Sequence, residues 1–79
     1  MAESTFEVVR RVLVEGLSID ENIVALESRL KEDFEADSLD AVEIIMMLEE
    51  EFKVEVNPEQ AGAIETVADL VSLIDSLRA

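Results

Sequence analysis

The sequence Glu35-Ala36-Asp37-Ser38-Leu39-Asp40 runs from an acidic loop into a strongly apolar segment that continues to Phe52. Asp and Ser are favoured helix N-caps, and an acid at Asp37 with another three residues later at Asp40 resembles a capping box. We therefore predict a helix over residues 37–52, capped by Asp37 or by Ser38. One serine stands at the junction between the loop and this helix, and we predict that the rest of the chain presents it.

Three further helices are indicated by capping residues that precede apolar residues at helical spacing. The first is expected over about residues 5–15, where Ser4 and Glu7 form the start and Gly16 lies near the end. The second is expected over about residues 58–63, with Asn57, Pro58 and Gln60 at its start. The third is expected over about residues 67–77, with Thr66 and Asp69 at its start. The first and the last of these have a clear apolar stripe. The middle one is short because Gly62 interrupts it.

A long connection, residues 18–37, separates the first two main helices. A structureless loop of this length is uncommon in a compact domain, so we expect apolar side chains to pin it and a helical turn to form near residues 28–31. The side chains expected to pin it are Ile19, Ile23, Leu26, Leu30 and Phe34. The predicted fold class is all-α: a small bundle of three main helices plus one short helix, with a long first loop, in one domain over residues 1–79.

The composition excludes several functions. The chain has no cysteine and no histidine, which removes disulfides, the usual zinc ligands and the usual general base near neutral pH. Twenty acidic residues against six basic ones give a net charge of −14, which disfavours nucleic acid and anionic membranes and favours basic partners. No apolar run is long enough to span a membrane, and the first residues lack the layout of a signal peptide. We expect a cytoplasmic monomer without a metal site.

The predicted helix over residues 37–52 has more apolar residues than one buried face requires. One stripe comprises Ala41, Ile45, Leu48 and Phe52, widened by Ile44, and a second comprises Leu39, Val42 and Met46. If the core takes only the first stripe, the second is an exposed patch edged by carboxylates, which is a common form of docking surface. Alternatively, this helix is central and buried nearly all round.

Acidic residues are concentrated around this helix. Residues 32–59 contain eleven acids and one base, Lys53, for a net charge of −10, which leaves −4 for the rest of the chain. A charge run is usually a solvated face. Because this run overlaps the second apolar stripe, we favour the hypothesis that it steers basic partners toward Ser38.

Three roles are open to Ser38. A serine at a helix start is most often only a cap. A nucleophile is poorly supported, because no histidine can activate it and no nucleophile-elbow motif is present. The third role is modification by another enzyme, which needs an exposed hydroxyl beside a recognisable surface.

The chain resembles the bacterial acyl carrier proteins. Asp37-Ser38-Leu39-Asp40, then Val42-Glu43 and residues 48–52, LEEEF, are very close to that family's signature, and the order of helices agrees over the whole chain. The resemblance implies a carrier rather than an enzyme. Ser38 would hold 4′-phosphopantetheine, transferred from coenzyme A by a phosphopantetheinyl transferase, and the thiol of that arm would carry acyl chains as thioesters. A carrier without cysteine must import its thiol in this way.

The resemblance also implies roles for residues beside Ser38. Residues expected to meet basic patches on fatty acid synthesis enzymes are Asp37, Leu39, Asp40, Val42, Glu43, Met46, Glu49 and Glu50. Residues expected to line a cleft that shelters the acyl chain are Ile45, Leu48, Phe52, Val56, Ala61 and Ile64.

The chain departs from the family pattern in two places. The family usually has Leu-Gly where this chain has Phe34-Glu35, and an acid often replaces Lys53. Because glycine adopts backbone angles that Glu35 adopts less easily, the loop before Ser38 is a place where the shape could differ. These departures leave open a carrier dedicated to a specialised pathway, such as polyketide synthesis or another acyl transfer. An acidic helical adaptor without an arm is the other alternative.

Overall fold

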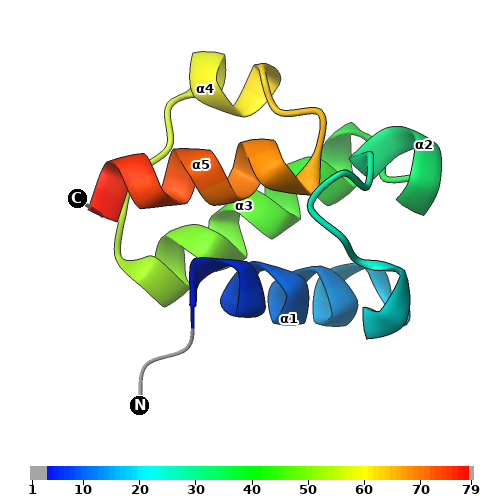
Figure 1. The fold of residues 1–79 in the computed structure, drawn as a ribbon. Helices are drawn as coiled ribbons and strands as arrows, with labels where there is room; N and C mark the ends of the chain where they lie inside the picture. Colours follow the sequence, from blue (N-terminus) through cyan, green and yellow to red (C-terminus); the bar gives the residue numbers. More distant parts are fainter. Residues whose placement is uncertain (1–3, 79) are drawn as a thin grey trace.

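The computed structural model describes residues 4–78, which form five α-helices and one 3-10 helix. The elements are α1 (Thr5–Leu17), η1 (Glu21–Ile23), α2 (Leu30–Phe34), α3 (Ser38–Phe52), α4 (Pro58–Gly62) and α5 (Val67–Arg78). Figure 1 shows α1 running opposite to α3 and α5, with the short helices α2 and α4 at the periphery. The predicted all-α class with three long helices is confirmed. Within the described range, no helix is long and apolar enough to cross a membrane.

The predicted helix starts are confirmed at the level of individual hydrogen bonds. Complete capping boxes begin three helices: Ser4 with Glu7 at α1, Asp37 with Asp40 at α3, and Asn57 with Gln60 at α4. At α5 the N–H of Asp69 donates to the Thr66 hydroxyl at 3.2 Å, and the N–H of Thr66 donates to the Asp69 carboxylate at 3.1 Å. Each cap satisfies N–H groups that no helical carbonyl can reach.

The core lies where α1, α3 and α5 meet. Its fully buried side chains are Val9, Leu13, Leu48, Val67, Leu70 and Ile74. On α3, burial centres on Ile44 and Leu48, whereas Ala41, Ile45 and Phe52 are only half-buried. The alternative that this helix is buried all round is wrong, because Leu39, Val42 and Met46 remain 73%, 53% and 58% exposed.

The predicted end of the first helix is wrong. α1 continues through Gly16 to Leu17, and Ser18 ends it in the left-handed region at φ 55°. A Cβ atom at Gly16 would collide with Cδ1 of Ile44. Glycine at this position therefore allows α1 and α3 to approach closely, and it does not end the helix.

The long connection is held differently from the prediction. Leu30 and Phe34 are buried as expected, but Ile23 and Leu26 are 51% and 45% exposed. Ile19 packs against the core as expected, and the loop is held in addition by buried Val24 and Ala36 and by the buried hydroxyl of Ser28. That hydroxyl accepts from the Ala25 N–H at 3.0 Å and donates to the Ile23 carbonyl at 3.1 Å. The expected helical turn is displaced to Leu30–Phe34, and η1 adds a second short turn.

Candidate functional site

Ser38 is the first residue of α3 and is exposed to solvent. The cap of α3 is Asp37, whose carboxylate accepts from the N–H of Asp40 at 2.9 Å. The interpretation of Ser38 as the cap is therefore wrong. Within residues 4–78 the Ser38 hydroxyl has no hydrogen-bond partner, so local structure makes no use of it and another molecule can reach it.

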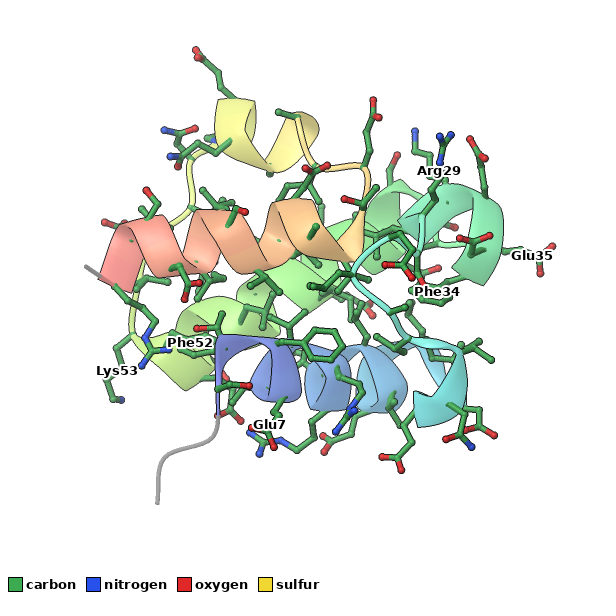
Figure 2. All side chains as sticks on the ribbon, viewed as in Figure 1. Glu7, Arg29, Phe34, Glu35, Phe52 and Lys53 are labelled. Carbon is green, nitrogen blue, oxygen red and sulfur yellow. The ribbon has the colours of Figure 1, made fainter. Side chains whose placement is uncertain are left out.

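The turn before Ser38 is fixed by α2. The N–H groups of Glu35 and Ala36 both donate to the carbonyl of Leu30, and the side chain of Ala36 is buried. Glu35 adopts the left-handed region, at φ 55° and ψ 31°, while Figure 2 shows its carboxylate pointing outward. Glu35 thus adopts angles that favour glycine, at a local cost of about 1 kcal/mol. Two backbone hydrogen bonds and a buried side chain thus hold the turn that leads into Ser38, although Glu35 is an unfavourable residue type there.

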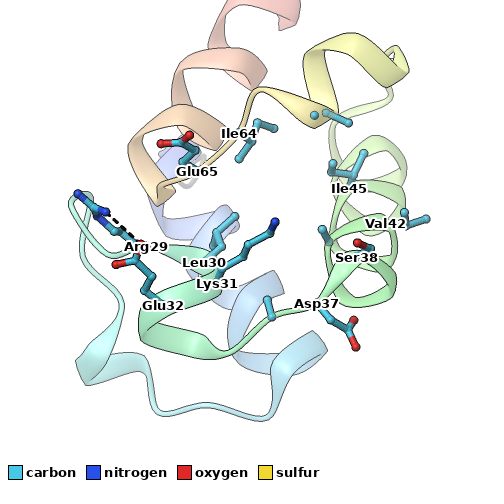
Figure 3. Close-up of a pocket in the computed structure, with 14 residues that line it drawn as sticks. Arg29, Leu30, Lys31, Glu32, Asp37, Ser38, Val42, Ile45, Ile64 and Glu65 are labelled. Atoms are coloured by element: carbon cyan, nitrogen blue, oxygen red, sulfur yellow. Dashed lines mark hydrogen bonds and ion pairs between the residues drawn. The ribbon is translucent and has the colours of Figure 1, made fainter.

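A groove of about 590 Å³ opens beside Ser38, between α2, α3 and the connection from α4 to α5 (Figure 3). Its lining residues are Arg29, Leu30, Lys31, Glu32, Ala36, Asp37, Ser38, Ala41, Val42, Ile45, Ala61, Gly62, Ile64 and Glu65. A second void of about 30 Å³ shares six of these residues and reaches inward to Leu13, Ile44 and Leu70. The groove therefore has charged residues at its rim and apolar residues on its floor, and this floor adjoins the core.

Three of the six residues predicted for an acyl cleft, Ile45, Ala61 and Ile64, line this groove. The other three lie elsewhere. Leu48 is fully buried in the core, Val56 is half-buried, and the Phe52 ring lies 4.9 Å below the guanidinium of Arg78. The structure thus brings half of the predicted set together at the Ser38 end of α3.

The eight residues predicted for partner docking are at Asp37 and along α3. Leu39, Val42 and Met46 form an exposed apolar row, and Glu43 and Glu50 are exposed beside it. Three of the acids also have structural bonds: Asp37 and Asp40 form the capping box, and the Glu49 carboxylate accepts from the N–H of Val56 at 2.9 Å. We call the five residues Leu39, Val42, Glu43, Met46 and Glu50 the outer face of α3.

Two basic residues at the groove were missed. Arg29 and Lys31 both line it, although Ser38 stands in the most acidic part of the chain. The guanidinium of Arg29 pairs with the carboxylate of Glu32 at 3.1 Å. Their positions just before the acidic run were visible in the sequence, but only the packing of α2 against α3 places them in the lining of the groove that Ser38 also borders.

The far wall of the groove is anchored by Asp69. Its carboxylate accepts from the N–H groups of Glu65 and Thr66 at 2.9 and 3.1 Å. These bonds favour the ionised form and lower the pKa of Asp69 below its ordinary value of 3.8. The wall is also tied to α2, because the N–H of Leu30 donates to the Glu65 carbonyl at 3.0 Å.

Comparison with known proteins agrees with this geometry. A family model described as the phosphopantetheine attachment site matches residues 7–74. An acyl carrier protein of Helicobacter hepaticus is 53% identical over 72 residues, which is 91% of this chain and 95% of that protein. The chain belongs to the acyl carrier protein family. Another member, from Campylobacter jejuni, is 48% identical over 75 residues, covering 95% of this chain and 97% of the relative.

The fold agrees as well. The structure of a putative acyl carrier protein from Mycobacterium tuberculosis superposes with a TM-score of 0.87 at 25% identity, covering 92% of this chain and 97% of that one. Members of this family are carriers and not enzymes, and they hold 4′-phosphopantetheine covalently. The residues around Ser38 fit that group, because an exposed hydroxyl without a local hydrogen bond stands at the rim of a groove with an apolar floor.

Proposed function

We propose that Ser38 is the attachment point of 4′-phosphopantetheine and that this protein carries acyl chains as thioesters for fatty acid synthesis. The observation that carries the proposal is that Asp37, and not Ser38, caps α3. Asp37 supplies the cap, which leaves the Ser38 hydroxyl exposed and without a local hydrogen bond. An enzyme can therefore modify this hydroxyl without breaking the capping hydrogen bonds at the start of α3.

The chain itself supplies position and shelter. When bound, the arm supplies a terminal thiol on which an acyl group forms a thioester. Ser38 holds the root of the arm at the rim of the groove, and Ile45, Ala61 and Ile64 offer apolar surface close to that root. Burying a methylene group against such surface gains about 0.8 kcal/mol, so the groove favours a folded-back acyl chain. No residue of the chain needs to act as acid or base.

The outer face of α3 is the proposed docking surface for the transferase and for fatty acid synthesis enzymes. Its apolar row next to exposed acids offers contact area at the centre and charge at the edge. The charge of −10 over residues 32–59 attracts enzymes with basic patches. Because this face adjoins Ser38, a docked enzyme has the arm within reach.

The test is transfer of the arm. The purified chain is incubated with coenzyme A and a phosphopantetheinyl transferase, and its intact mass is measured. We expect a gain of one phosphopantetheine in the native chain and none in Ser38→Ala. Ser76→Ala, which removes an exposed hydroxyl from α5, is the matched control and should be modified fully. Modification of Ser38→Ala, or an unchanged native mass, would reject the proposal.

A further inference from the structure

The groove beside Ser38 contains a lysine that the carrier role does not explain. Lys31 projects from α2, and Figure 3 shows its side chain extending across the groove toward α3 and Ser38. Of the basic side chains in the described range, Arg10 and Arg78 lie over aromatic rings, while Arg11 and Arg29 pair with carboxylates. Lys31 and Lys53 have no such partner within residues 4–78.

The carboxylates near Lys31 are directed elsewhere. Glu32 pairs with Arg29, and Asp37 is engaged in the cap of α3. Figure 3 shows the carboxylates of Asp37 and Glu65 pointing away from the middle of the groove. The ammonium group of Lys31 is therefore available to an anion that enters the groove beside Ser38.

A phosphodiester on Ser38 would be such an anion. It would add a negative charge to a chain that already carries −14, and repulsion from the surrounding acids would oppose it. Two features would offset this repulsion: the positive end of the α3 dipole, at whose first residue the phosphate would stand, and the ammonium group of Lys31 across the groove.

We propose that Lys31 is the counter-ion of the arm's phosphodiester and holds the root of the arm toward the groove. This inference rests on the proposed attachment at Ser38. The contact keeps the arm folded back over the apolar floor while no partner is bound. A basic enzyme that docks on the outer face of α3 competes for the same phosphate and releases the arm toward its own active site.

The inference is tested by a cycle that combines the arm with the lysine. The melting temperatures of the native chain and of Lys31→Gln are measured before and after loading, with loading verified by intact mass. At low salt, loading should change the melting temperature of the native chain by about 1–8 °C more favourably than that of Lys31→Gln. This difference should shrink in 0.5 M salt, because the pair is exposed to screening.

Two further variants identify the cause. Lys31→Arg keeps the charge and should keep the coupling. Lys53→Gln removes the other lysine without an ion-pair partner, at the opposite end of α3, and should behave as the native chain does. Equal effects of loading in the native chain and in Lys31→Gln would overturn the role of Lys31 while leaving attachment at Ser38 intact. A failure of the native chain to load would instead reject the proposed function.

A second measurement uses the loaded native chain. The phosphorus-31 resonance of the phosphodiester should move as salt is raised, toward the position that it has in loaded Lys31→Gln. The resonance of loaded Lys53→Gln should follow the native one. A native resonance that is insensitive to salt and identical in all variants would contradict the contact.

Discussion

The two ends of α3 differ in how they are held. At the Phe52 end, Arg78 covers the aromatic ring, Arg11 pairs with Glu51 at 3.2 Å, and the Glu49 carboxylate binds the N–H of Val56. Nearby, the Thr5 hydroxyl joins the start of α1 to Asp75 and Arg78 of α5. Figure 2 shows Phe52 and Lys53 at this end and Glu35 at the other side of the molecule.

The Ser38 end is held by the Asp37–Asp40 capping box and by backbone bonds, and within residues 4–78 the Ser38 hydroxyl has no hydrogen-bond partner. A cap, a left-handed residue and the short helix α2 set the path of the chain, while the groove opens beneath and the outer face lies exposed. The side-chain links between helices named above thus gather at the Phe52 end, and access to the site is kept at the other. A carrier needs both, because its attachment point must be accessible while the bundle stays folded.

The largest difference between the two regions should appear in the core. Leu48→Ala should lower the free energy of unfolding by about 2–5 kcal/mol, because it leaves a cavity at a fully buried position. Ile45→Ala should cost well under half as much, since Ile45 is half-buried and already borders the groove. Urea denaturation of both variants measures this. Equal losses would mean that the groove end is packed as tightly as the core.

The exposed face should matter for binding and not for stability. We expect Glu43→Lys combined with Glu50→Lys to weaken binding to a basic partner such as the transferase by about tenfold, with a loss that shrinks as salt rises. Titration calorimetry at two salt concentrations measures the affinity. Glu15→Lys with Glu21→Lys makes the same charge change on exposed residues of α1 and η1. If this control pair weakens binding equally, net charge rather than the outer face determines affinity.

The contribution of Asp69, which anchors the far wall of the groove, to the melting temperature should depend on pH. Asp69→Ala should lower the melting temperature by a few degrees at neutral pH, because it removes acceptors for two N–H groups. Since the folded state lowers the pKa of Asp69, its contribution is complete above the ordinary value of 3.8 and is lost as pH falls through the folded-state pKa. The difference in melting temperature between the native chain and Asp69→Ala should therefore shrink below about pH 4.

Melting curves from pH 7 to pH 3 test this dependence. Glu65→Ala removes a neighbouring exposed carboxylate that makes none of these bonds. The difference in melting temperature between this variant and the native chain should therefore not show the same dependence on pH. A gap for Asp69→Ala that stays constant over the whole range would show that charge plays no part in anchoring the wall.

The smallest effect is expected at the turn before Ser38. Glu35→Gly should raise the free energy of unfolding by about 0.5–1 kcal/mol, because glycine adopts φ 55° without the steric cost that a Cβ atom imposes. Glu35→Ala removes the same charge but keeps the Cβ atom, so it should give no such gain. Equal gains in both variants would assign the effect to charge repulsion.

Prediction from the sequence succeeded where the determining residues are neighbours. The four helix starts were found because a cap and its partner lie three residues apart, as at Asp37 and Asp40. The end of α1 was missed because Gly16 is required by its contact with Ile44 on α3 and not by a helix end. The position of α2 was missed for a similar reason, since the N–H of Leu30 donates to the Glu65 carbonyl in the connection from α4 to α5.

The sequence by itself determined the starts of α1, α3, α4 and α5, the charge and the family, because each depends on residues close together in the chain or on their total. Only the tertiary structure decided which stripe of α3 is buried, that the Ser38 hydroxyl has no hydrogen-bond partner within residues 4–78, and that Lys31 stands across a groove from it. Burial and the shape of a groove are sums over contacts between distant segments. Burial and groove shape are therefore determined only when α1, α3 and α5 pack together.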